Sequence, residues 1–414
     1  MNHNDKRVQI ACYFTNIASG AVCNLSPLLF LTFNSLYGID YALLGLLVLI
    51  NFFTQLGIDL IFSFFSHKFN VQKTVRIMPL LTITGFIIYA IFPFFAPNHV
   101  YLGLVLGTIV FSLAGGLAEV LISPIIAALP NDNPERAMSK LHSIYAWGAI
   151  FTVVTVTVFL LLFGRENWQW VALVFTLPPL FAAILFFRSK IPTMPTPEKI
   201  SGTLRYLKNK ELWLCVIAIF LGGASECGMG QWCSSYLEQA LQIPKFWGDI
   251  FGVALFSLCL AFGRTLYAKR GKNIEKNLFF GAIGATLCYA TAVLANAPIL
   301  GLLACGITGF CVAMLWPGSL VVIADRIPDG GVFIYAMMAA GGDCGAAVGP
   351  QLMGLVTETV VESSAMASFA QSLGLSVEQL GMKAGMAAGM IFPLLAIFVY
   401  FLLLRSKKKI MRKI

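Results

Sequence analysis

Two acidic residues lie within long apolar stretches of this 414-residue sequence. They are Glu119 in FSLAGGLAEVLISP and Glu226 in GGASECGMGQWCSSYLEQ. An ionisable side chain at membrane depth costs about 2.5–3.5 kcal/mol on insertion scales, so it needs a cavity or a partner. We therefore predict that Glu119 accepts a hydrogen bond from a bound solute or carries a proton. A structural pairing with a neighbouring helix is the alternative.

Glu226 is followed at five and six residues by Gln231 and Trp232. An acid, an amide and an indole close together suit a polyhydroxylated ligand. Carboxyl and amide groups pair with hydroxyls, and an aromatic face packs on the apolar face of a sugar ring. Anchoring of the span at the membrane interface is an equally good interpretation of Trp232. Further candidates for lining the same cavity are Asn24, Tyr145 and Trp316.

Three other charged residues, Asp59, Arg264 and Asp343, are predicted to form a gate or a charge pair. Asn51, Gln55 and Asp59 are spaced by four and share one helix face, which predicts hydrogen bonds between helices or a gate. Arg264 is expected to reach the membrane interface or to pair with an acid. Asp343, in AAGGDCGAAVGP, is flanked by small residues that bring another helix close, so a charge pair and a ligand contact both fit. The acids near span ends, expected to be satisfied by water or headgroups, are Glu238, Asp249 and Asp325.

Transmembrane helices are the elements that must position these residues. Hydrophobic residues make up 58% of the chain and charged residues 11%, whereas a soluble domain carries about a quarter. A spanning helix takes roughly 20 apolar residues, so little of the chain remains for a soluble domain. The sequence predicts an all-α integral membrane protein with spans near 8–34, 41–65, 75–95, 100–129, 138–163, 169–188, 212–236, 247–268, 277–296, 299–324, 331–357 and 384–404.

The loops predict the orientation. Of the 28 lysines and arginines, three fall in loops of one side (Arg165, Lys245 and Lys383), one lies in a span (Arg264), and the other 24 lie on the opposite side. Positive charge marks the cytoplasmic side, so both termini are predicted to be cytoplasmic, in a cell membrane that fits a bacterial inner membrane. The basic tail is then an inner-side anchor that meets membrane lipids, and no nucleic-acid partner is indicated.

Polar segments divide the chain. The stretch 189–211 holds three prolines followed by the basic residues Lys199, Arg205, Lys208 and Lys210, which predicts a cytoplasmic linker between six-helix bundles at 1–188 and 212–414. The stretch 358–383 predicts a short interfacial helix, with an ordinary loop as the alternative.

Metal and cofactor chemistry is not indicated by the sequence. The ten cysteines all fall within apolar segments, none at zinc-ligand spacing, and the four histidines are scattered. No nucleotide-binding loop is present either. We therefore predict no catalytic residues, no metal, no cofactor and no enzymatic activity.

An internal repeat relates the two bundles at a displacement of 193 residues. The residues Gly116, Pro124, Asp132 and Gly148 recur as Gly309, Pro317, Asp325 and Gly341. Each set runs from the fourth predicted span of its bundle into the fifth. Parallel repeats of six spans predict pseudo-symmetric bundles with a binding cavity near the bilayer midplane.

With these features the chain resembles the major facilitator superfamily, and within it the fucose–galactose–glucose:proton symporters. The matching motifs are GLAEVLISP, LHSIYAWGA, GASECGMGQWCSSYL, the pair Gly263–Arg264, and FCVAMLWPGSL. The resemblance implies a sugar-like substrate and makes Glu119 the best protonation candidate. Two departures stand out: His67 and Asn70 replace an acid and a glycine of the superfamily's second loop, and NLSPLLF lacks the first-span acid of fucose permeases.

The sequence thus predicts a monomeric secondary transporter of a small neutral sugar, most simply a hexose, working by alternating access. Proton symport would use Glu119 and Glu226. An exporter of drugs or metabolites, with a larger and more apolar cavity, is the runner-up, and a membrane-embedded enzyme comes after it.

Overall fold

The computed structural model describes the chain apart from residues 1–2, 66–68, 131–133, 193–202, 271–272, 328–330 and 412–414. Within the described ranges all regular secondary structure is helical. The chain forms two compact units. Unit 1 comprises Met1–Ile39 and Ile50–Ile200, and unit 2 comprises Asp40–Leu49 and Ser201–Ile414.

Long apolar helices account for the expected membrane passes. Nine helical segments of the described chain are long and apolar enough to cross a membrane, or ten if α1 (His3–Leu28) and α2 (Phe30–Tyr37), bent by 45°, form one span. Two more described helices, α6 (Pro134–Phe163) and α15 (Gly331–Glu362), are 30 and 32 residues long. The helices of the described chain are consistent with the twelve passes that the sequence predicts.

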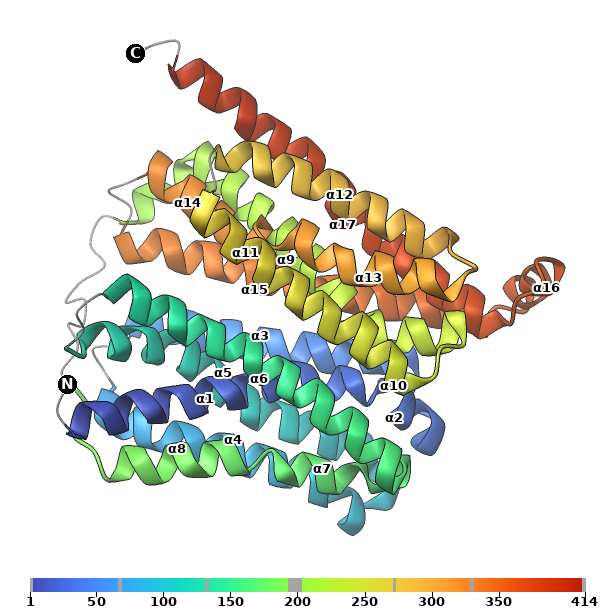
Figure 1. Cartoon of the computed structure of the whole chain (residues 1–414), viewed down its shortest axis with the longest axis horizontal. Helices are drawn as coiled ribbons and strands as arrows, with labels where there is room; N and C mark the ends of the chain where they lie inside the picture. Colours follow the sequence, from blue (N-terminus) through green and yellow to red (C-terminus); the bar gives the residue numbers. More distant parts are fainter. Residues whose placement is uncertain are drawn as a thin grey trace. The chain divides into compact units, whose positions relative to one another are not determined.

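Unit 1 is a bundle in which α4 packs along α5 and α1 packs along α6 and α8 (Figure 1). Besides α1, α2 and α6, its elements are α3 (Tyr41–Phe65, from Ile50 onward), α4 (Val71–Phe95), η2 (Pro97–His99), α5 (Val100–Ala128), η3 (Arg165–Asn167), α7 (Trp168–Val174) and α8 (Leu177–Phe187).

Unit 2 is built around α9, which packs against α15 and α17 (Figure 1). Besides α15 and the first residues of α3, its elements are η4 (Thr203–Lys208), α9 (Lys210–Leu241), α10 (Lys245–Gly248), the π-helix η5 (Asp249–Ala254), α11 (Leu255–Arg270), α12 (Ile274–Leu294), α13 (Pro298–Val312), α14 (Leu315–Arg326), α16 (Ser364–Ser372) and α17 (Val377–Met411). The short helix expected within 358–383 is α16, begun by a Ser363 side-chain cap. Its interfacial role stays a prediction.

The internal repeat appears as equivalent helix contacts in the two units. Gly148 packs against α1, and its counterpart Gly341 packs against α9. Gly116 packs against the backbone of α3, and its counterpart Gly309 against the backbone of α11. An added β-carbon at any of the four would lie 2.1–2.9 Å from the neighbouring helix, so glycine is required for this approach. Asp132, another member of the repeat, falls outside the described residues.

Candidate functional site

A buried hydrogen-bond network in unit 1 centres on Asn51 of α3. Its side-chain oxygen accepts hydrogen bonds from Ser112 Oγ of α5 (2.6 Å) and Gln55 Nε2 (3.0 Å). Its amide nitrogen donates to the carbonyl of Val22 in α1, at 3.4 Å. Three helices therefore meet at one asparagine. These contacts support the packing interpretation of Asn51 and Gln55.

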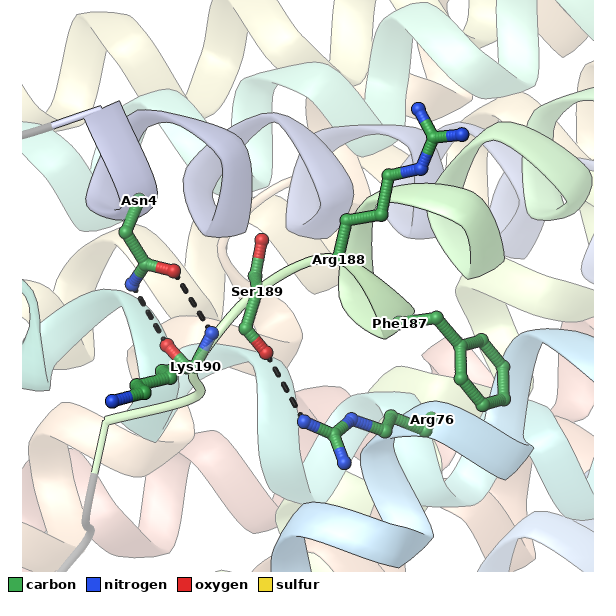
Figure 2. Close-up of a pocket in the computed structure, with 6 residues that line it drawn as sticks. All are labelled: Asn4, Arg76, Phe187, Arg188, Ser189 and Lys190. Atoms are coloured by element: carbon green, nitrogen blue, oxygen red, sulfur yellow. Dashed lines mark hydrogen bonds between the residues drawn. The ribbon is translucent and has the colours of Figure 1, made fainter.

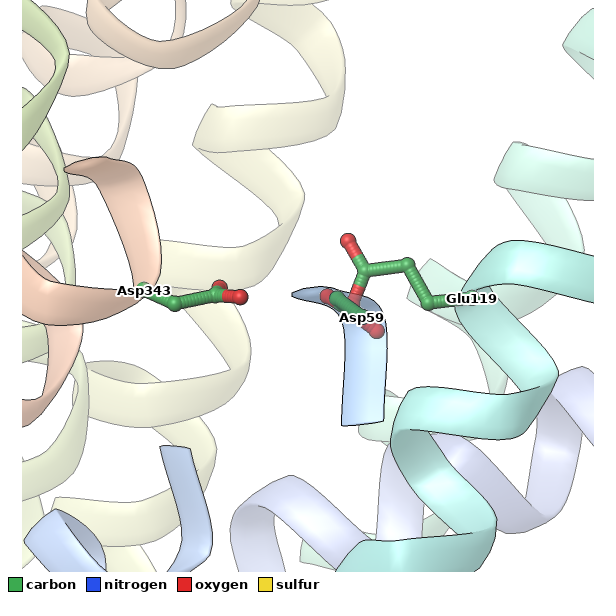
Figure 3. Close-up of side chains that lie close together, drawn as sticks. All are labelled: Asp59, Glu119 and Asp343. Atoms are coloured by element: carbon green, nitrogen blue, oxygen red, sulfur yellow. The ribbon is translucent and has the colours of Figure 1, made fainter. Parts of the chain in front are cut away.

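Two acids lie about two turns further along the same pair of helices. Asp59 extends from α3 and Glu119 from α5, and their carboxylates are close together in Figure 3, with oxygens within 4.8 Å of each other. Asp59 is buried, whereas Glu119 is accessible. Two ionised carboxylates repel at this distance, and a bound proton or a cation removes the repulsion. The pair can therefore take up a positive charge.

Two further candidates, Asn24 and Tyr145, lie on α1 and α6. The Asn24 amide donates to the carbonyl of Gly20 in its own helix, at 2.8 Å, which leaves its oxygen to accept other bonds. Tyr145 is half-buried on α6. A role of either in binding a solute stays a prediction.

An ion pair joins two of the predicted residues of unit 2. Arg264 Nη2 of α11 lies 3.0 Å from Glu226 Oε1 and 3.2 Å from Glu226 Oε2 of α9. Its Nε also donates to the carbonyl of Ala313, at the break between α13 and α14, at 3.1 Å. The side chains of Arg264 and Glu226 are 41% and 17% exposed. Of the two alternatives for Arg264, the structure therefore shows the pairing with an acid.

Asp343 lies on α15 in the tight environment that its flanking residues predict. The residue, also drawn in Figure 3, is 4% exposed and belongs to unit 2. An added β-carbon at Gly345 would lie 1.9 Å from the carbonyl oxygen of Phe220 in α9. One at Gly342 would lie 2.5 Å from the ring of Trp316, which is half-buried on α14. Glycines thus bring α9 and an aromatic ring against the helix that carries Asp343.

Gln231 and Trp232 are buried in α9, at 6% and 1% exposure. The Trp232 indole donates to the carbonyl of Pro350 in α15, at 3.0 Å, and its ring centroid lies 6.3 Å from that of Tyr41. A buried ring does not anchor a span in lipid headgroups, so the interfacial interpretation of Trp232 is wrong. Its contacts support packing, and a ligand would reach the ring only after a rearrangement.

The expectation that water or headgroups satisfy Asp249 is wrong. Instead of facing water near a span end, it is 0% exposed at the start of the π-helix η5. It accepts a hydrogen bond from Ser234 Oγ and pairs with Lys245 Nζ at 3.1 Å. A lysine four residues earlier was the available signal, because such a pair shares one helix face.

The fold and these polar centres define a polytopic α-helical membrane protein with ionisable groups inside its bundles. The chain matches the family model described as Major Facilitator Superfamily over residues 10–350, and it belongs to that family. A search of the curated proteins found no match.

Solved structures of several transporters share the fold. The nucleoside transporter NupG has a TM-score of 0.69 at 14% identity, covering 98% of this chain and 100% of its own. The POT family transporter PepTSo has a TM-score of 0.72 at 13% identity, covering 99% of each chain. The Major Facilitator Superfamily transporter FucP, in the outward conformation, has a TM-score of 0.58 at 13% identity, covering 94% of this chain and 98% of its own.

Family and fold make the chain a multi-pass membrane transporter of a small molecule, not an enzyme. Neighbours at these identities show the fold alone. The motifs of the sequence are therefore what favours a sugar.

Proposed function

We propose that the chain is a secondary active transporter of a small neutral sugar, most simply a hexose, driven by proton symport through alternating access. The observation that carries the coupling is the pair of carboxylates, Asp59 and Glu119, whose oxygens lie within 4.8 Å on two apolar helices. The family membership supplies the transport mechanism, and the pair supplies a group that changes charge.

A proton on the Asp59–Glu119 pair would be linked to the transport cycle. Repulsion between two carboxylates is strong where water is scarce, so the protonated and ionised pairs favour different surroundings. Glu119 is the accessible member and the better candidate for proton exchange. A substrate hydroxyl that donates to Glu119 would connect binding to protonation.

The charge balance in unit 2 favours a neutral substrate. Arg264 and Glu226 compensate each other, so this pair has no net charge to offer an ionic solute. Hydrogen-bonding groups on Asn24, Tyr145 and Gln231, together with the aromatic face of Trp316, suit a polyhydroxylated ring. In this proposal Glu226 serves substrate and proton only when it leaves Arg264 during the cycle, and Asp343 contributes to the gate.

Transport by purified protein in proteoliposomes tests the proposal. Candidate monosaccharides would first be screened by thermal shift, and hits would then be measured in counterflow without a gradient and in uptake with an inward proton gradient. Glu119→Gln is expected to abolish gradient-driven accumulation while retaining counterflow, because the neutral amide cannot exchange a proton.

The controls separate the parts of this proposal. A sodium gradient at fixed pH tests whether the carboxylate pair takes a metal ion instead of a proton. Full gradient-driven accumulation by Glu119→Gln would remove Glu119 from the coupling. Stabilisation by lipophilic compounds alone, with no response to any monosaccharide, would favour the exporter.

We also propose that the chain is monomeric and that both termini are cytoplasmic, as the basic loops indicate. A C-terminal fluorescent-protein fusion should fluoresce in cells, and a C-terminal alkaline phosphatase fusion should be inactive. A fluorescent-protein fusion without fluorescence and an active alkaline phosphatase fusion would show the opposite topology, with the C-terminus outside.

A further inference from the structure

A basic pocket lies in unit 1, at the start of α4 and the end of α8. The pocket is an open depression with a volume of about 560 Å³, and Figure 2 shows the six residues that line it. The lining residues are Asn4, Arg76, Phe187, Arg188, Ser189 and Lys190. Three of the six are cations and none is an acid. The pocket uses no residue of the proposed substrate or coupling sites.

Buried polar atoms in this pocket lack partners among the described residues. The Arg76 guanidinium donates through Nη2 to the carbonyl of Ser189, at 3.1 Å, but its buried Nε makes no hydrogen bond. The Ser189 hydroxyl is also without a partner, although the residue is only 4% exposed. Buried donors are normally satisfied, so these two point to a ligand with acceptor oxygens.

One edge of the pocket is fixed by hydrogen bonds between the Asn4 side chain and the Lys190 backbone. The Asn4 amide donates to the carbonyl of Lys190 at 2.9 Å, and Asn4 Oδ1 accepts from the Lys190 backbone N–H at 2.8 Å (Figure 2). These reciprocal bonds fix the segment after α8 against the start of α1. The cations are therefore presented on a fixed backbone, which lowers the entropy lost on binding.

An apolar surface adjoins the pocket. Phe187, Ile184 and Leu180 lie exposed along α8, and Ile77 and Leu80 lie exposed along α4. In a membrane-spanning bundle such side chains face the acyl chains of lipids. A ligand here would meet cations and hydroxyl donors at one end and hydrocarbon-compatible surface at the other.

We infer that this pocket binds an anionic phospholipid. Its phosphate accepts hydrogen bonds from Arg76 and Ser189 and interacts with Arg188 and Lys190, while its acyl chains lie along α4 and α8. Arginine is suited to phosphate because its planar fork of N–H donors matches phosphate oxygens. With the orientation proposed above, the lipid belongs to the cytoplasmic leaflet.

Native mass spectrometry of the full-length protein, titrated with phosphatidylglycerol or phosphatidylcholine, tests this inference. Phosphatidylglycerol should bind preferentially, and Arg76→Gln or Arg188→Gln should each weaken its binding about five- to tenfold. Arg188→Gln is the safer variant, because the Arg188 side chain makes no hydrogen bond among those described; its backbone N–H bond to Ile184 is kept in the variant. Lys73→Gln is the matched control: Lys73 is exposed on α4, one turn from Arg76, and does not line the pocket.

Three outcomes would overturn the inference. Equal loss of binding in Lys73→Gln and Arg188→Gln would show a general surface-charge effect with no specific site. Equal binding of the two lipids would show that the phosphate charge is not recognised. Displacement of bound phosphatidylglycerol by millimolar inorganic phosphate would identify the ligand as a soluble anion.

Discussion

The contact between α9 and α15 gives a sharp test of how unit 2 is held together. Gly345 of α15 faces the carbonyl oxygen of Phe220 in α9, and an added β-carbon would lie 1.9 Å from that oxygen. It would also lie 3.0 Å from the backbone nitrogen of Ala224. Both neighbours are backbone atoms, which cannot rotate away as a side chain can. Gly345→Ala therefore has to push the helices apart.

The required displacement sets the size of the effect. Ordinary van der Waals contact begins at 3.4 Å, so α9 and α15 must separate by 3.4 − 1.9 = 1.5 Å at this point. Overpacking of a tight contact costs about 1–3 kcal/mol. For a folded unit of this size, about 2–4 °C of melting temperature is lost per kcal/mol, so Gly345→Ala should melt roughly 2–12 °C lower.

Thermal unfolding of the purified protein in detergent measures this change. The matched control is Gly57→Ala in α3, where an added β-carbon meets nothing within 4 Å. Alanine favours a helix over glycine by about 1 kcal/mol, so the control should melt at or above the wild-type temperature. If Gly345→Ala also kept or raised the melting temperature, the close approach of α9 and α15 would be refuted.

Three further predictions follow from buried or paired polar groups. Lys383→Met should lower the free energy of unfolding by about 1–3 kcal/mol, because Lys383 Nζ donates a hydrogen bond to the backbone carbonyl of Ala295 at the end of α12. The control is Lys276→Met at an exposed position, which should leave the free energy of unfolding unchanged in the same melting assay. Asn51→Leu leaves two donors unsatisfied and should destabilise by about 1–3 kcal/mol, and an unchanged melting curve would contradict the network. A double-mutant cycle of Arg264→Gln and Glu226→Gln, measured by thermal unfolding, should give an interaction free energy of at most about 1 kcal/mol, because the Arg264 side chain is 41% exposed. A much larger coupling would mean that the pair is shielded from solvent.

The sequence predicts the architecture well because a bilayer imposes one rule on every span. Backbone groups must be satisfied within the segment, so length and hydropathy are sufficient to identify helices. The glycines of the repeat also predicted helix contacts, because helices in lipid associate by close packing at small residues. Gly148 and Gly341 show this, because both pack against the first long helix of their unit.

Side-chain partners were predicted less well, because they depend on which helices become neighbours. The acid that pairs with Arg264 is 38 residues away, and no local pattern in the sequence selects Glu226 over other acids. Asp59 and Glu119 are 60 residues apart and became a pair only through the packing of α3 and α5. Hydropathy also placed the start of the last span, predicted at residue 384, too late. Lys383 interrupts the apolar pattern, yet α17 begins at Val377 and buries this lysine by bonding it to Ala295 and Asn296.

Anchoring of Lys190 by Asn4 also joins the beginning of unit 1 to the segment that follows its last helix. Asn4 lies at the start of α1 and Lys190 follows α8, so the two reciprocal bonds link positions 186 residues apart in the chain. Local opening at one of these positions therefore releases the other. Asn4→Ala should raise amide hydrogen exchange at the start of α1 and at the end of α8 together.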